Sequence, residues 1–222
     1  MTALEKHTDP AGFVRDNTVL TAPPLLPEIR LHLATEVTPL WEATEETLRK
    51  TNLPPPYWAF AWPGGRAVAR FVLDRPELVR GRTVLDFAAG TGCVAVAAAM
   101  AGASAVRACD IDAFSLAAIR LNAEANGVEV GVESDDLVGH PLPGVDVVLA
   151  GDVCYEKPMA ERVTAWLRGL AAGGTLVLLG DPGRAYVPKD GLEFLARYAV
   201  PTSLDLEDRE VRDTTVWRLL PP

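Results

Sequence analysis

The sequence predicts an α/β protein with a seven-stranded, mostly parallel sheet, helices on both faces and an antiparallel hairpin at the C-terminal end. From Arg82 to Leu179, apolar runs of strand length alternate with segments of helical length. This alternation is typical of right-handed crossover units and a parallel sheet. From Thr202 onward two strand-like runs follow one another closely, which predicts the hairpin. An apolar content of 49% is typical of a globular protein with a full core.

The chain divides into two expected parts. Residues 1–56 are expected to form an N-terminal helical extension, and residues 57–222 one compact unit. In the extension, apolar residues at helical spacing predict one helix that starts near Pro27 and includes residues 28–33, and another over residues 38–50.

Apolar runs set the expected elements of the compact unit, and capping residues set their ends. The helix after the second predicted strand is expected to begin at an aspartate N-cap and to end at Gly127 in a left-handed conformation. The predicted strands are Thr83–Phe87, Ala105–Cys109, Val128–Val132, Val145–Ala150, Thr175–Leu179, Thr202–Leu206 and Val211–Leu219. The predicted helices are Gly65–Leu73, Thr91–Ala101, Ala113–Asn126, Pro158–Leu170 and Gly191–Tyr198.

Composition and charge exclude several classes of partner. A net charge of -9 argues against non-specific binding of nucleic acid, which needs a basic surface. No apolar stretch is long enough for a membrane span, and the N-terminal residues have no signal core, so we expect a cytoplasmic protein without a membrane partner. Cys93, Cys109 and Cys154 form no CxxC pair and are expected to be buried free thiols without a metal role.

The glycine loop Gly90-Thr91-Gly92 indicates a nucleotide site, because it follows a predicted strand and precedes a predicted helix. The pattern through Ala95 also fits a dinucleotide-binding loop, so an NAD-dependent oxidoreductase is one hypothesis. Asp86 argues against it, since a carboxylate at the strand end would repel a pyrophosphate. The same carboxylate would attract the ammonium and sulfonium of S-adenosylmethionine.

Carboxylates also follow the next two predicted strands. Asp110 can accept hydrogen bonds from ribose hydroxyls, whereas either Asp110 or Asp112 could cap the helix that follows. We expect Asp112 to be the cap and Asp110 to bind ribose. Asp135 and Asp136 could meet an adenine amino group, or could form a solvated turn.

Two further features lie near the same expected sheet edge. Asp152 and Tyr155 follow the fourth strand, where they could position an amine, although Asp152 could instead be an ordinary helix cap. In the loop before the first strand, Trp58 and Trp62 could seal the core or wall a pocket for a cation.

These motifs together resemble a known group of enzymes. Asp86-Phe-Ala-Ala-Gly-Thr-Gly, Asp110-Ile-Asp112 and Leu149-Ala-Gly-Asp152-Val-Cys-Tyr155 resemble the seven-β-strand, Rossmann-like S-adenosylmethionine-dependent methyltransferases. A narrower resemblance is to the protein lysine methyltransferases that modify the β subunit of electron transfer flavoprotein. It is carried by Tyr57-Trp-Ala-Phe-Ala-Trp62-Pro-Gly-Gly65, Asp152-x-x-Tyr155, Gly180-Asp-Pro-Gly-Arg184, Pro23-Pro-Leu-Leu-Pro-Glu-Ile-Arg30 and Pro39-Leu-Trp-Glu-Ala-Thr-Glu45.

The resemblance implies S-adenosylmethionine as cofactor, S-adenosylhomocysteine as product, no metal, and the electron transfer flavoprotein β subunit as protein substrate. It implies that Asp152 and Tyr155 place the target lysine. The positions it assigns to the cofactor are Trp58, Trp62, Asp86, Gly90, Thr91, Gly92, Asp110 and, on the adenine side, Asp135 or Asp136.

Other hypotheses stay open at this point. Ribosomal protein L11 methyltransferases share much of the same core, but their Asn-Pro-rich motif after the fourth strand is absent from this chain. A small-molecule methyltransferase, in which the N-terminal helices form a lid, and a binding module that keeps the fold without catalysis are further alternatives.

Overall fold

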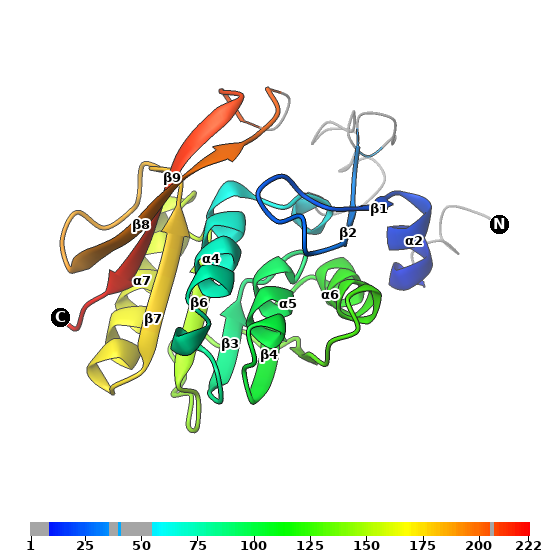
Figure 1. The fold of residues 1–222 in the computed structure, drawn as a ribbon. Coiled ribbons are helices and arrows are strands. Elements are labelled where there is room, and N and C mark those ends of the chain that lie inside the picture. Colours follow the sequence, from blue (N-terminus) through cyan, green and yellow to red (C-terminus); the bar gives the residue numbers. More distant parts are fainter. Residues whose placement is uncertain (1–8, 36–39, 41–54, 205–206) are drawn as a thin grey trace.

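The computed structural model describes residues 9–35, 40, 55–204 and 207–222. Its main sheet has seven strands in the order β5-β4-β3-β6-β7-β9-β8 (Figure 1). The strands are β3 (Thr83–Phe87), β4 (Ala105–Cys109), β5 (Gly131–Glu133), β6 (Val147–Gly151), β7 (Leu176–Asp181), β8 (Leu192–Pro201) and β9 (Val211–Leu219).

The strands from β5 to β7 are parallel, and β9 runs antiparallel to both of its neighbours. Strand β3 is central, with β4 on one side and β6 on the other. The carboxyl ends of these three strands therefore lie at one edge, at the point where the strand order reverses. Ligands of open α/β sheets bind at such a switch point.

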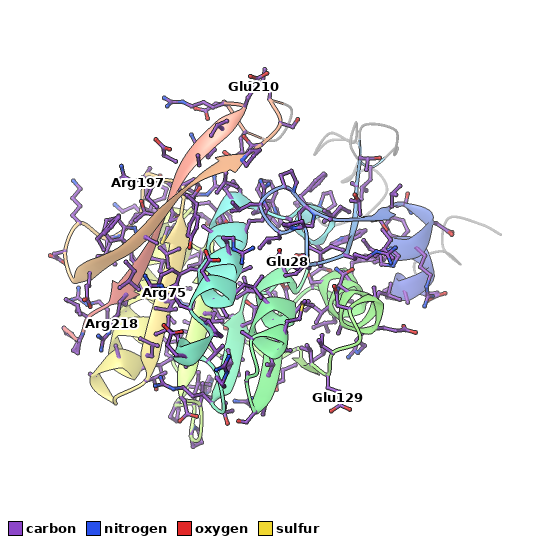
Figure 2. The ribbon with its side chains drawn as sticks, in the orientation of Figure 1. Glu28, Arg75, Glu129, Arg197, Glu210 and Arg218 are labelled. Atoms are coloured by element: carbon purple, nitrogen blue, oxygen red, sulfur yellow. The ribbon has the colours of Figure 1, made fainter. Side chains whose placement is uncertain are left out.

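Helices cover both faces of the sheet, as predicted. Apolar residues of α4 (Pro63–Asp74), α5 (Cys93–Met100) and α6 (Ala113–Ala125) share one core cluster, and α7 (Lys157–Ala172) packs in another on the opposite face (Figure 1). Alternate residues of β6 face the two clusters: Leu149 lies in the first and Val148 in the second. Charged side chains such as Glu129 and Arg218 lie on the outside (Figure 2).

The described N-terminal residues differ from the expectation. They form a short helix, α2 (Pro10–Asp16), and a ribbon of β1 (Val19–Thr21) with β2 (Leu31–Leu33). The helix predicted near Pro27 is therefore wrong. The His32 amide donates to Oδ1 of Asn122 on α6 at 2.7 Å, so pairing with distant elements outweighs the local helical pattern. The helix predicted over 38–50 lies outside the described residues apart from Leu40, and the division of the chain at residue 56 stays a prediction.

The predicted helix Gly191–Tyr198 is also wrong, because these residues begin strand β8. The C-terminal hairpin is confirmed, but its first strand is β8 rather than Thr202–Leu206, of which residues 205–206 lie outside the described residues. Its second strand, Val211–Leu219, has the predicted limits. Good helix formers in β8 pair along the whole of β9, and this tertiary pairing overrides their propensity.

The remaining elements match the predictions within a few residues, and β3 and β4 match at both ends. Cys93, Cys109 and Cys154 are buried free thiols, as expected. Among the described residues, no helix combines the length and apolar character that crossing a membrane requires.

Candidate cofactor and substrate site

The glycine loop forms a tight turn between β3 and α5. The φ angles of Ala88, Gly90 and Gly92 are 53°, 52° and 72°, all in the left-handed region that favours glycine. Gly92 is also the N-cap residue of α5, and a Cβ on it would lie 3.1 Å from Cγ1 of Ile119 on α6. Glycine at this position therefore allows α6 to pack against the start of α5.

Asp86 lies beneath this loop and is only 1% exposed. Its Oδ2 accepts a hydrogen bond from the backbone amide of Ala95, in the first turn of α5, at 2.9 Å. Burial is the largest influence and raises the pKa of Asp86 to about 8, while the bond from Ala95 opposes the rise. A cation brought close to this carboxyl group would favour its ionised form.

Asp110 and Asp112 make different contacts, and the expected cap is confirmed for Asp112. Asp112 caps α6, because its Oδ1 accepts a hydrogen bond from the Phe114 amide at 3.0 Å. Asp110 instead binds the loop: its Oδ2 accepts from the Gly90 amide at 2.8 Å, and its Oδ1 from the Asp112 amide at 3.0 Å. The end of β4 is thus tied to the glycine loop.

Two cavities meet at this sheet edge, with Ala88 lining both. The loop cavity, about 50 Å³, is lined by Phe60, Ala61, Trp62, Gly65, Arg66, Asp86, Ala88, Ala89, Gly90, Thr91, Cys93, Val94, Gly151 and Asp152. The apolar cavity, about 210 Å³, is lined by Phe87, Ala88, Cys109, Asp110, Ile111, Asp135, Asp136, Leu137, Val138, Val153, Met159, Arg162 and Val163.

The apolar cavity combines apolar walls with carboxylates, which suits a nucleoside better than a phosphate. Asp110, Asp135 and Asp136 line it, and Arg162, which also lines it, pairs with Asp136 at 3.8 Å. Carboxylates can accept hydrogen bonds from hydroxyl and amino groups, whereas they repel phosphate oxygens. Asp136 is partly engaged by the Val138 amide, which donates to its Oδ1 at 3.1 Å.

Asp152 follows β6 and has a φ of 57°, which is strained for a residue other than glycine. Its Oδ2 accepts from the Gly65 amide at 2.9 Å, and its Oδ1 from Nη2 of Arg184 at 3.2 Å. Burial raises the pKa of Asp152 to about 6, with Arg184 acting in the opposite direction. Since Glu156 is the N-cap residue of α7, the alternative that Asp152 caps this helix is wrong.

Arg184 links Asp152 to the C-terminal hairpin. Its Nη2 also contacts Oε1 of Glu207 at 2.9 Å, and Arg212 approaches the other oxygen of Glu207 at 3.4 Å. The side chains of Glu207 and Asp152 are only 6% and 11% exposed. The motif that ends in Arg184 follows β7, so it lies at the same edge of the sheet as Asp152. This position after a strand could have identified Arg184 as a candidate site residue from the sequence.

An aromatic rim, made of Tyr57, Trp62 and Tyr155, lies beside these groups. The ring centroids of Tyr57 and Tyr155 are 5.8 Å apart, and those of Tyr57 and Trp62 are 6.1 Å apart. Tyr57 and Tyr155 are 48% and 46% exposed, so the rim faces solvent. Burial of the remainder of Tyr155 raises the pKa of its hydroxyl.

Trp58 and Trp62, for which the sequence predicts the same role, lie in different environments in the structure. Trp62 lines the loop cavity and donates from its indole Nε1 to the Tyr57 carbonyl at 3.0 Å. Trp58 is 1% exposed and stacks on Phe114 of α6 at 6.0 Å, within the core and outside the lining of both cavities. The position of Trp58 supports the alternative in which it seals the core.

The other predicted residues are distributed as follows. Asp86, Gly90, Thr91 and Asp152 line the loop cavity, whereas Gly92 packs against α6. Sequence reasoning missed Arg66 and Glu207, because nothing in their local sequence marks them as site residues. Only the fold brings Arg66 of α4 and Glu207 of the hairpin to this edge.

Comparisons with known proteins identify the family of this chain. A family model described as "Ribosomal protein L11 methyltransferase (PrmA)" matches residues 71–180. The "Electron transfer flavoprotein beta subunit lysine methyltransferase" of Xenopus laevis is 40% identical over 220 residues, which cover 96% of this chain and 88% of the relative. The chain belongs to the electron transfer flavoprotein β-subunit lysine methyltransferase family.

The human protein with the same description is 34% identical to this family member over 217 residues, or 95% of the chain and 82% of the relative. A solved structure, magnesium protoporphyrin IX methyltransferase (ChlM) from Synechocystis with bound SAM, has a TM-score of 0.52 at 21% identity. The match covers 70% of this chain and 77% of ChlM, and it supports the fold. Family membership decides against the NAD-dependent hypothesis for the glycine loop. The L11 family model covers residues 71–180, whereas the electron transfer flavoprotein β-subunit lysine methyltransferases match over nearly the whole chain.

Proposed function

We propose that this protein transfers methyl groups from S-adenosylmethionine to lysine side chains of the electron transfer flavoprotein β subunit. The observation that carries the proposal is the position of Asp152. This carboxylate is fixed by Gly65 and Arg184 in the lining of the loop cavity. Membership of a lysine methyltransferase family supports the same reaction. We also propose, on the sequence expectation alone, that the reaction takes place in the cytoplasm.

The residues of the two cavities fit this cofactor. Asp110 can accept hydrogen bonds from ribose hydroxyls, and Asp135 or Asp136 from the adenine amino group, between apolar walls that include Val138 and Met159. Asp86 and the glycine loop would hold the amino-acid end. When bound, S-adenosylmethionine supplies an electrophilic methyl group on a positively charged sulfur that is a good leaving group.

The chain's own residues would prepare the lysine for attack. The aromatic rim of Tyr57, Trp62 and Tyr155 would cover one side of the bound amine and exclude water there. This would lower the pKa of the lysine, so that its ammonium releases a proton to solvent and leaves the neutral nucleophile. Ionised Asp152 would accept a hydrogen bond from the incoming ammonium and from the methylated product. Tyr155 would face the same cation with its ring. Alignment of the amine with the methyl group is the main contribution of the site.

Intact-mass analysis tests the proposal. The protein is incubated with S-adenosylmethionine and electron transfer flavoprotein, and the β subunit is expected to gain the mass of one or more methyl groups on lysine. Asp152→Asn is the control and should give no gain. If the β subunit gains no mass although S-adenosylhomocysteine binds, this substrate is wrong. Label from the cofactor found only in small molecules of a lysate would then favour the small-molecule alternative.

A further inference from the structure

Arg66 is a buried cation with unused hydrogen-bonding capacity. It lies in the first turn of α4 and is 5% exposed. Its Nε is buried and has no hydrogen-bond partner among the described residues. Burial lowers the pKa of Arg66, and a buried charge is costly unless a partner compensates it. The position thus calls for an anion.

The nearby carboxylates are held by other groups. Asp152 and Glu207 are close enough to Arg66 to influence it, but both accept hydrogen bonds from Arg184, and Asp152 also from the Gly65 amide. Helix α4 itself does not stabilise a cation at this position, since the N-terminal end of a helix carries partial positive charge. Arg66 at the start of α4 therefore adds positive charge to an end that already favours anions.

The side chain borders the loop cavity, where it lies among two acids. Arg66, Asp86 and Asp152 are the charged residues of that lining. Arg66 also lines a neighbouring cavity of about 230 Å³, together with Trp62, Pro201 and Glu207. A ligand that carries both an ammonium and a carboxylate would match a cation and an acid placed in one small cavity.

We propose that Arg66 binds the α-carboxylate of the cofactor's amino-acid moiety, while Asp86 faces its ammonium. The inference rests on the proposed function in one respect, that the bound nucleoside is S-adenosylmethionine or its product. Arg66 would then make the site select nucleosides that carry the amino acid. A planar guanidinium suits this role because it can form paired hydrogen bonds with a carboxylate.

A thermodynamic cycle tests the proposal with the full chain. Isothermal titration calorimetry compares S-adenosylhomocysteine with 5′-methylthioadenosine, which lacks the amino acid, on the wild type and Arg66→Met. The variant should bind S-adenosylhomocysteine roughly 10- to 100-fold more weakly, as expected for the loss of a charged hydrogen bond. Its affinity for 5′-methylthioadenosine should change less than about twofold.

Matched variants separate binding from structure. Arg70 lies one turn further along α4 and pairs with Glu28 at 2.8 Å and with Asp74 at 2.8 Å. Arg70→Met should therefore leave the affinities for both ligands unchanged. Arg66→Lys keeps the charge without the planar fork and should recover part of the discrimination, and it carries the test if Arg66→Met does not fold.

Two kinds of result would overturn the inference about Arg66. One is an equal loss of affinity for both nucleosides, which indicates a structural role. The other is full affinity for S-adenosylhomocysteine in both Arg66 variants. A wild type that binds neither nucleoside would overturn the proposed function as well. If the wild type binds S-adenosylhomocysteine and substitution of Arg66 does not change the affinity, only this inference is overturned.

Discussion

The backbone amide of Gly65 donates a hydrogen bond to Oδ2 of Asp152 at 2.9 Å, across 87 positions of the sequence. The contact is possible because glycines meet where α4 begins and where β6 and β7 end. A Cβ on Gly64 would lie 2.6 Å from Oδ2 of Asp152, and a Cβ on Gly180 would lie 2.6 Å from Cγ2 of Val68. The position of Asp152 is therefore set by close backbone packing.

Gly64→Ala should disturb this packing. The new methyl group would also meet the Gly180 carbonyl, so we expect a loss of roughly 1–3 kcal/mol in the free energy of unfolding, together with slower methyl transfer. Urea unfolding and initial rates would measure both effects. Gly169→Ala is the matched control. Gly169 lies within α7, and a Cβ on it would meet nothing within 4 Å outside the local helix backbone, so this change should stabilise by up to about 1 kcal/mol. Wild-type stability in Gly64→Ala would contradict the account.

Asp152→Asn should stop methyl transfer while sparing cofactor binding. The amide keeps the shape of the side chain but loses the charge that would hold the ammonium, so the rate should fall by roughly 100-fold or more. Calorimetry with S-adenosylhomocysteine should show an affinity within a few-fold of wild type, since Asp110 and the glycine loop remain. An active variant would remove Asp152 from the mechanism.

Arg184 should set the pH at which Asp152 becomes functional. Burial raises the pKa of Asp152 to about 6 and Arg184 holds it down, so Arg184→Met should raise it further. Because the ionised form is required, the acidic limb of kcat/KM for the protein substrate should move to higher pH. Arg212→Met is the control, because Arg212 contacts Glu207 rather than Asp152, and it should shift the limb less. Equal shifts, or none, would argue against direct coupling.

Asp86 should make the ligand-free protein less stable as pH rises. Its pKa is raised from 3.8 to about 8, so between these values the folded state holds a proton that the unfolded state releases. The contribution of this carboxyl group to the free energy of unfolding has its full value below about pH 4. It falls by on the order of 1 kcal/mol per pH unit up to about pH 8. Urea unfolding at several pH values should show a smaller decline in Asp86→Asn. The same slope in both proteins would refute the shift.

The two tryptophans should respond differently to truncation. Trp58→Ala removes a buried ring that stacks on Phe114 and should cost about 3–5 kcal/mol of stability. Trp62→Ala should cost less, but it should weaken binding of S-adenosylhomocysteine because Trp62 lines the loop cavity. Thermal unfolding and calorimetry on both variants would test this. Weaker cofactor binding by a stable Trp58 variant would reverse the assignment.

The parts of the site that are formed by residues close together in the chain could be predicted from the sequence. The strand, glycine loop and helix around Gly90 are contiguous, and Asp112 caps the helix that immediately follows it, so both could be placed from neighbouring residues. Strand β8 could not, because its pairing with β9 outweighs its helical pattern. The difference between Trp58 and Trp62 depends on packing against α6, which lies far along the chain.

The charged groups behind the site needed the tertiary fold. Arg66 and Glu207 come from elements on opposite sides of the central strands in sequence, and Arg184 reaches Glu207 only because the hairpin folds back over the sheet edge. No spacing in the sequence links these positions. Their burial, rather than their residue type, distinguishes them from the exposed arginines and acids of the surface.

The glycine contact between α4 and the ends of β6 and β7 has a consequence for biosynthesis. Because α4 precedes the sheet in the chain and Gly180 lies almost at the end of β7, the contact between Gly64 and Gly180 can form only after β7 has left the ribosome and paired with β6. The packing that fixes Asp152 is therefore completed only late in synthesis. Fragments that stop before β7 should lack this packing, and in the cell they would be exposed to proteases for as long as they last.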